Sequence, residues 1–311
     1  MPTHDDTAAG PFLPLLLLGT AVLLWGTSFA AMKIALTGFE PMAVVWFRMV
    51  VGSAIILPLW SRIPKPNRLP GDTKWLLLLI LFQPCLYFLF EGFALDYTTS
   101  AQAGMISAIV PLLVALGAWV ILAEKLTRLT MAGLVLSVIG VVGLSLGGES
   151  SAQASNPLLG NTLELLAMTS GAAYMLVLRH LSRRYNPWFL TAIQTFAGAV
   201  FFLPGALLSH PSAWASAPVE AWFGVAYLGG FVTLGAFGLY NMAMSRVAAA
   251  RAVIAINVIP VVAVITGWIL LGESLTPLQF GAGGLIGIAI YLGEKGSRTD
   301  PNEFPPVPEV A

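Results

Sequence analysis

Three polar side chains fall at four-residue intervals inside an apolar segment: Gln83, Tyr87 and Glu91. In a helix this spacing places all three along one face. Polar groups within long apolar helices are costly and usually face a cavity or a polar partner. We therefore expect this face to line a solute pathway, with Gln83 and Tyr87 near the middle of the segment. A hydrogen-bonded seam between two helices is the alternative.

Glu91 and Arg48 are the charged groups with binding chemistry. Glu91 is the only carboxylate that we expect within a span. It would bind a proton or a substrate amine, or else be an ordinary carboxylate near the outer end. Arg48 lies seven residues into its apolar segment, ~10 Å deep at ~1.5 Å per residue. Arginine can clamp a carboxylate bidentately; the alternatives are pairing with Glu91 or extension outward to the surface.

Aromatic and amide side chains provide further candidates for binding a substrate. Trp25 is predicted near the middle of the first apolar segment, and Tyr174 in the inner half of the sixth. Aromatic walls suit apolar groups, and a Trp face can hold an ammonium, although ordinary packing is the alternative. Asn257 precedes a proline and could bond substrate or the broken backbone. Tyr240 and Asn241 are expected along the inner half of the route.

Two prolines, Pro111 and Pro260, fall near the centres of their segments. Proline removes a backbone hydrogen bond and clashes with the preceding turn. We predict hinges at both positions, with static kinks as the alternative. Glu124 and Glu273 close the same two segments and are interpreted as boundary and packing residues.

Catalytic signals are weak. Gly143-Leu144-Ser145-Leu146-Gly147 matches G-x-S-x-G, but that motif needs a strand-to-helix turn, whereas here it lies in an apolar segment. No Walker or dinucleotide motif is present, and the single cysteine, Cys85, is expected to serve packing. We therefore predict a protein that is not an enzyme and has no cofactor and no metal.

The amino-acid composition indicates which kind of secondary structure must position these side chains. Of 311 residues, 57% are hydrophobic and 10% are charged, which is too few charges to cover a water-facing surface. A helix needs ~20 apolar residues to cross a bilayer. Ten continuous runs predict an all-α integral membrane protein: 12–34, 41–60, 75–95, 99–123, 128–147, 158–181, 187–208, 219–245, 249–271 and 275–293. The formal net charge of zero gives no indication of a nucleic-acid partner.

The distribution of Lys and Arg predicts the orientation. Cytoplasmic loops of membrane proteins are enriched in these residues. With the N-terminus inside, thirteen of the fifteen fall on the inner side: Arg62, Lys65, Arg68, Lys74, Lys125, Arg128, Arg179, Arg183, Arg184, Arg246, Arg251, Lys295 and Arg298. We therefore expect both termini in the cytoplasm.

The two halves of the chain share spaced motifs. The pattern Pro-x7-Trp-x4-Glu-x-Leu-Thr begins at Pro111 and again at Pro260, a shift of 149 residues. A second pattern, Pro-x10-Gly-x5-Pro, begins at Pro41 and at Pro187. Arg48 then aligns with Gln194, so binding by this pair would be asymmetric.

An odd number of helices per unit makes the second unit enter from the opposite side. We predict two inverted five-helix repeats, 1–148 and 157–295, followed by a disordered cytoplasmic tail, 296–311. Inverted repeats recur in secondary transporters. Glycines in the fifth and tenth segments are expected to allow close packing of these helices against their own repeats, in a monomer; homodimer contact is the alternative.

Trp25-Gly26-Thr27-Ser28-Phe29, Ala94-Leu95-Asp96-Tyr97-Thr98-Thr99-Ser100 and the repeated Pro…Glu-x-Leu-Thr pattern resemble the EamA-type branch of the drug/metabolite transporter superfamily. The resemblance covers almost the whole chain. It implies a central cavity lined by both halves and export from the cytoplasm. It is closest to bacterial amino-acid exporters, which implies a location in the inner membrane of a bacterium.

We therefore expect a secondary transporter that exports amino acids or related small metabolites by alternating access. Its partners would be a small-molecule substrate and the lipid bilayer. A drug or nucleotide-sugar carrier is the second hypothesis. An intramembrane enzyme or a receptor that does not transport is the third.

Overall fold

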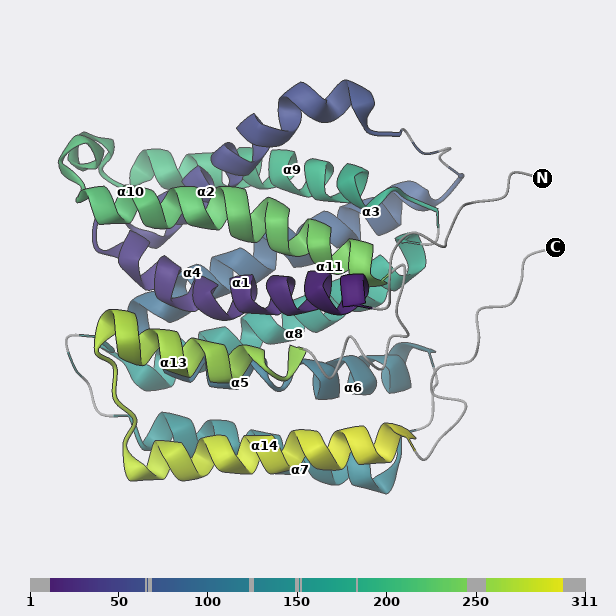
Figure 1. The fold of residues 1–311 in the computed structure, drawn as a ribbon, viewed down its shortest axis with the longest axis vertical. Coiled ribbons are helices and arrows are strands. Elements are labelled where there is room, and N and C mark those ends of the chain that lie inside the picture. Colours follow the sequence, from purple (N-terminus) through teal and green to yellow (C-terminus); the bar gives the residue numbers. More distant parts are fainter. Residues whose placement is uncertain are drawn as a thin grey trace.

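The computed structural model describes residues 12–64, 66, 69–122, 126–148, 151, 153–182, 184–244 and 256–298. Within these ranges the protein is helical, without strands, and has one isolated β-bridge, between Ser151 and Ala154. The helices lie side by side in a bundle, and α1 begins at the same end of the bundle as α14 ends (Figure 1).

The helices of the first half are α1 (Phe12–Leu36), α2 (Pro41–Ile56), η1 (Leu57–Arg62), α3 (Asp72–Ile80), η2 (Leu81–Leu86), α4 (Tyr87–Tyr97), α5 (Ser100–Ser107), α6 (Val110–Leu122) and α7 (Arg128–Leu146). Those of the second half are α8 (Pro157–Leu181), α9 (Pro187–Leu208), η3 (Pro211–Ser216), α10 (Val219–Ala226), η4 (Tyr227–Ala236), α11 (Phe237–Met244), α13 (Ile259–Leu271) and α14 (Pro277–Arg298). Because α14 runs through Arg298, residues 296–298 are helical rather than part of a tail.

Local sequence explains where several helices begin. Pro41, Pro157 and Pro187 stand in the first turn of α2, α8 and α9. Proline is preorganised for this position, where its missing N–H is not needed. Asn156 and Asn186 precede two of these prolines, and their side-chain oxygens accept from the backbone N–H of the first turn. Side-chain caps of this kind satisfy donors that a helix leaves unpaired.

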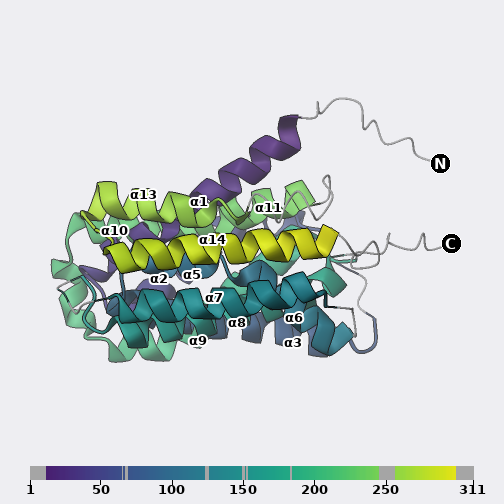
Figure 2. The same cartoon turned by 90° about the horizontal axis from the view of Figure 1, so that it is seen from below.

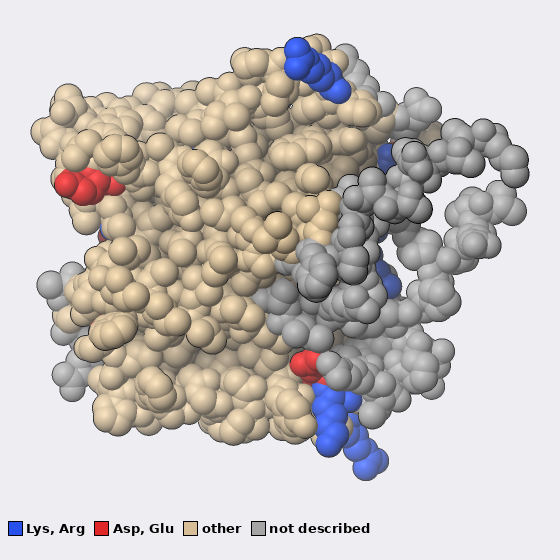
Figure 3. All heavy atoms as spheres, in the orientation of Figure 1, with Lys and Arg blue, Asp and Glu red and all other residues tan. Residues whose placement is uncertain are grey.

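Seven helices in the described part are long and apolar enough to cross a membrane, by length and composition: 16–36, 41–62, 72–97, 100–121, 128–146, 187–208 and 219–240. Ile259–Leu271 is a shorter apolar helix. On the face drawn in Figure 3, a broad surface between the two ends carries no Lys, Arg, Asp or Glu, and Lys and Arg gather toward the end where α14 finishes. Such a surface suits contact with lipid.

Three predicted spans are interrupted helices. The span at 75–95 contains η2, a π-helical segment in which Gln83 has extended dihedral angles. The span at 219–245 contains a second π-helical segment, η4. The span at 99–123 breaks between α5 and α6, so Pro111 is the second residue of α6. Pro260 likewise is the second residue of α13. Both prolines therefore follow a break instead of bending a continuous helix.

Helices α7 and α14 lie at one edge of the bundle (Figure 1) and pack along their lengths, side by side in the view of that edge (Figure 2). A Cβ added at Gly133 would lie 2.6 Å from the carbonyl oxygen of Ala289, and one at Gly140 would lie 2.5 Å from Ile286. The glycines of this fifth segment therefore serve close packing, as predicted, but against α14 of the second half rather than within their own repeat. On α14 the glycines divide into two groups. A Cβ at Gly283 would lie 2.7 Å from Met105 Sδ, whereas one at Gly281, Gly284 or Gly287 would meet nothing within 4 Å among the described atoms.

Candidate functional site

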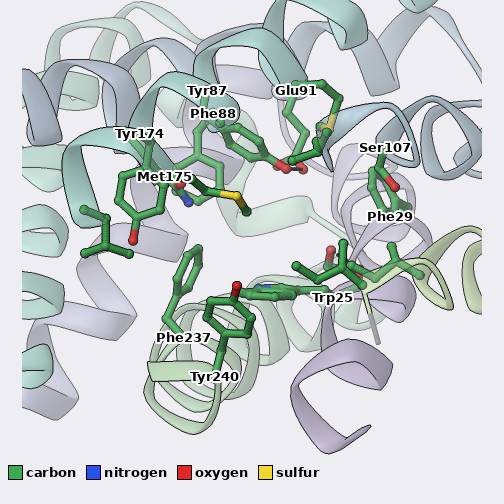
Figure 4. A pocket seen from close by; sticks show the side chains of 18 of the residues that line it. Trp25, Phe29, Tyr87, Phe88, Glu91, Ser107, Tyr174, Met175, Phe237 and Tyr240 are labelled. Atoms are coloured by element: carbon green, nitrogen blue, oxygen red, sulfur yellow. Dashed lines mark hydrogen bonds between the residues drawn. The ribbon is translucent and has the colours of Figure 1, made fainter. Parts of the chain in front are cut away.

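One pocket lies among α1, α2, α4, α8 and α11 in the interior of the bundle (Figure 4). Seven of the nine residues predicted to bind substrate line it: Trp25, Arg48, Gln83, Tyr87, Glu91, Tyr174 and Tyr240. They come from both halves of the chain. The lining also contains apolar side chains that the sequence did not single out, among them Phe29, Phe88, Met175 and Phe237.

A buried ion pair forms the charged part of the pocket. Arg48 Nη1 lies 3.5 Å from Glu91 Oε2, and the two side chains are 4% and 6% exposed. The Tyr87 hydroxyl donates to Glu91 Oε1 at 2.9 Å. The ring of Phe88 lies beneath the guanidinium, with 4.1 Å between the Arg48 Cζ atom and the ring centroid. A charged group out of water needs such partners, because unpaired burial is very costly.

Thr233, in the π-helical segment η4, orients Arg48 from the second half of the chain. Arg48 Nε donates to Thr233 Oγ1 at 2.8 Å, and that hydroxyl donates to the Leu228 carbonyl at 2.9 Å. A guanidinium has five N–H donors in a fixed fork. Binding one of them to Thr233 fixes the plane in which the others are presented to the pocket.

The break at Gln83 exposes backbone carbonyls that side chains of the second half satisfy. Gln194 Nε2 on α9 donates to the Gln83 carbonyl at 2.7 Å. Ser170 Oγ on α8 donates to the neighbouring Phe82 carbonyl at 2.9 Å. Irregular backbone at membrane depth is tolerated where it is buried in protein. Gln194, predicted to bind substrate, thus supports the pocket wall without lining it.

Aromatic rings form the opposite wall of the pocket. Trp25 contacts Phe237 and Tyr240, with ring centroids 5.4 Å and 4.9 Å apart. Figure 4 shows these rings facing Tyr87 and Glu91 across the cavity. Edge-to-face and tilted contacts of this kind are favourable. The wall offers apolar surface to a ligand whose charged end lies at Arg48 and Glu91.

A predicted amide in the segment before α13 is not part of the lining. Asn257 lies between Ile256 and Ile259, which do line the pocket, and its side-chain oxygen is buried without a hydrogen-bond partner among the described residues. The side chain of Asn241 lies outside the described part of the chain.

Glu164 on α8 is a buried carboxyl that the sequence analysis overlooked. It is 0% exposed, and it interacts electrostatically with Glu91 and Tyr87. Glu91 is therefore not the only carboxylate inside the bundle. The signal was present, because an acidic residue within an apolar run of membrane length indicates a functional group.

Of the two glutamates that end the repeated motif, Glu273 lies in the described part of the chain, where it makes three hydrogen bonds. Glu273 accepts from the backbone N–H groups of Ser100 and Ala101 and from the Ser100 hydroxyl, at 2.8–2.9 Å. A carboxylate at a helix N-terminus satisfies unpaired donors and the helix dipole. This geometry fits the boundary role predicted for it. Glu124 lies outside the described residues.

The serine of the G-x-S-x-G match and the single cysteine both lie in packed helical segments. Ser145 lies in helix α7, donates to the Val141 carbonyl and accepts from Asn161, so the G-x-S-x-G match is helical here. Cys85 is buried, as expected of a packing residue. In the described part of the chain, no group of three or more His, Cys, Asp and Glu could hold a metal ion.

The model of the EamA-like transporter family matches residues 12–146 and 158–293. The chain belongs to this family. The uncharacterized transporter YetK of Bacillus subtilis is 29% identical over 89% of this chain and 83% of that protein. A probable terminal-alkyne amino-acid exporter of Streptantibioticus cattleyicolor is 25% identical over 86% of this chain and 88% of that protein.

A solved crystal structure shares the fold, with a TM-score of 0.64 at 23% identity, over 92% of this chain and 98% of the other. Together with the membrane-length helices, the family identifies a multi-pass membrane transporter. Membership of this family implies a small-molecule substrate and the lipid bilayer as partners.

Proposed function

We propose that this EamA-family transporter exports amino acids or closely related small metabolites. The observation that carries the proposal is the Arg48–Glu91 pair, 3.5 Å apart and buried beside an aromatic wall. A free amino acid has a carboxylate, an ammonium and a side chain of variable polarity. The pocket offers a complementary group for each of these.

Arg48 would bind the substrate carboxylate through the N–H groups not engaged with Thr233. Glu91, with Tyr87 fixing one of its oxygens, would bind the ammonium. Charge-assisted hydrogen bonds of this kind are roughly twice as strong as neutral ones. The substrate would open the existing ion pair and replace each charge with one of its own, so no charge is left unpaired.

The wall formed by Trp25, Phe237 and Tyr240 would receive the substrate side chain. Apolar burial is worth ~25 cal/mol per Å², which favours aliphatic or aromatic amino acids over small polar ones. The printed name of the Streptantibioticus cattleyicolor relative, a probable amino-acid exporter, supports the same class of substrate.

We further propose ten transmembrane helices in two inverted repeats, at residues 1–148 and 157–295. Repeat-related positions behave alike: π-helical segments interrupt the chain at 81–86 and 227–236, and Pro111 and Pro260 each stand second in a helix. Two mirrored conformations would provide alternating access, with hinges at the two prolines. The Lys and Arg distribution favours cytoplasmic termini, and the bacterial relatives support a location in a bacterial inner membrane.

The test is counterflow in liposomes that contain the purified protein, with a panel of labelled amino acids. Exchange of at least one amino acid, abolished by Arg48→Gln, is the expected result. A folded protein that exchanges none of them would overturn the substrate class. A hydrophobic cation is the second candidate, because the aromatic wall and Glu91 could hold one without Arg48. The panel therefore includes a labelled aromatic cation.

A further inference from the structure

Glu164 is buried on α8 in a position that has no evident structural use. Glu164 is 0% exposed, and neither of its carboxyl oxygens has a hydrogen-bond partner among the residues that the structure describes. Buried polar groups in proteins are nearly always hydrogen-bonded. An unpaired carboxylate there would cost far more free energy than the neutral acid. The site therefore accommodates Glu164 as the protonated acid.

Glu164 belongs to the face of α8 that lines the pocket. Met168 and Gly171 line the pocket, and they follow Glu164 by four and seven residues, which is the spacing of one helical face. Glu164 thus lies one turn beyond the pocket lining, ~6 Å along the helix at ~1.5 Å per residue. Two ionisable groups on α4, Glu91 and Tyr87, interact electrostatically with Glu164.

The other elements packed against α8 are α3, η2, α5, α6 and α7. No residue of α5 or α6 is ionisable. The remaining ionisable groups on the elements packed against α8, including α4, are Asp72, Lys74, Cys85, Asp96, Tyr97 and Arg128.

The charged residues among these lie far along the helix axis or at the surface. Asp72 pairs with Arg184, beyond the C-terminal end of α8, ~30 Å from Glu164 at ~1.5 Å per residue. Arg128 begins α7, whose opposite end contacts Asn161 through Ser145. Asp96 is exposed. No cation from these elements thus compensates Glu164, and Arg48 is already paired with Glu91.

Resting on the proposed function, we propose that Glu164 is the proton-binding site of this transporter, and that its proton leaves when the ammonium of a substrate enters the pocket beside Glu91. Two carboxyl groups that interact in a low-dielectric site do not both ionise, unless a cation is added. Arg48 compensates Glu91 alone. A substrate zwitterion brings a second cation while its carboxylate occupies Arg48.

The exchange balances in atoms and charge. With an empty pocket, Arg48 is positive, Glu91 is negative and Glu164 is neutral. On binding, the Glu164 O–H bond breaks, the proton passes to water on the open side, and the ammonium, bound to Glu91, offsets the new charge on Glu164. The substrate keeps all its own protons. On the other side, release of the substrate returns a proton to Glu164, so one proton moves inward for each amino acid exported.

The first test is infrared spectroscopy of the purified protein in lipid, which detects the C=O stretch of a protonated carboxyl group. At neutral pH without substrate, we expect such a band in the wild type and in Glu164→Asp. The band should be lost in Glu164→Gln. Glu220→Gln, which alters an exposed carboxylate in the first turn of α10, is the control and should keep the band. An unchanged band in Glu164→Gln would overturn the assignment.

The second test uses liposomes with an acidic interior and the membrane potential held at zero. Wild-type protein should accumulate the labelled amino acid about tenfold per pH unit, since each tenfold ratio corresponds to ~1.4 kcal/mol. Glu164→Gln should abolish accumulation yet retain counterflow. Accumulation by Glu164→Gln equal to that of the wild type would overturn the proton role. If the wild type exchanges no amino acid, the substrate proposal fails, and the infrared result alone decides the proton site.

Discussion

Arg48 on α2 and Glu91 on α4 meet inside the pocket, with 3.5 Å between Nη1 and Oε2, although 43 residues separate them along the chain. Thr233 from the second half completes the arrangement by accepting from Arg48 Nε. The charged centre of the pocket is therefore assembled from both repeats, and any relative movement of the two halves would change it.

Removing one member of this pair should be more damaging than removing both. Glu91→Gln leaves a buried guanidinium without its counter-charge, and breaking such a pair costs about 3–5 kcal/mol. We expect a large loss of thermal stability in Glu91→Gln and partial recovery in the double variant Arg48→Gln/Glu91→Gln. The measurement is thermal unfolding in detergent. Additive losses would mean that the two residues do not interact.

Tyr87→Phe removes the hydroxyl that donates to Glu91 Oε1. A net loss of about 0.5–1.5 kcal/mol is typical for one hydrogen bond, so we expect a several-fold rise in KM for exchange. Tyr291→Phe is the matched control, because Tyr291 is 63% exposed on α14. An equal effect of the two substitutions would remove the Tyr87 hydroxyl from the site.

Glu273→Gln should lower the stability of the protein without changing its affinity for substrate. The carboxylate satisfies three donors at the start of α5, and loss of a helix cap costs about 0.5–2 kcal/mol. We predict a lower melting temperature with an unchanged KM for the transported amino acid. A changed KM at unchanged stability would instead give Glu273 a role in substrate binding.

The proposed orientation can be tested with single cysteines, because the chain has one cysteine, Cys85, and it is buried. In a Cys85→Ser background, Glu220→Cys should react with an impermeant maleimide added to intact cells. Ser182→Cys, in the turn after α8, should react only after the membrane is opened. The reverse pattern would place the termini outside.

The sequence predicted much of the pocket for identifiable reasons. Tyr87 and Glu91 share α4, so their four-residue spacing places them on one helical face. Gln83 has extended dihedral angles in η2 and is not part of that face, although it also lines the pocket. The pairing of Arg48 with Glu91, first weighed as an alternative to substrate binding, is what the structure contains. It leaves room for the binding role, since a substrate can open the pair.

Other features of the fold and the pocket could not be predicted from the sequence. Thr233 contacts Arg48 across 185 positions, a distance over which no local pattern carries information. The breaks at Gln83 and before Pro111 interrupt runs of uniform hydropathy, so composition alone predicts continuous spans. Glu164 was detectable as an acidic residue in an apolar run, but its significance depends on the absence of a partner among the described residues.

The most direct test of the central claim is competition in the counterflow assay, using a transported amino acid and two of its derivatives. The carboxamide lacks the carboxylate that Arg48 would bind, and the deaminated acid lacks the ammonium that Glu91 would bind. We predict that the unlabelled amino acid competes fully and that each derivative competes at least ~10-fold more weakly, the loss of about 1.4 kcal/mol. Equal competition by all three would contradict recognition by the Arg48–Glu91 pair.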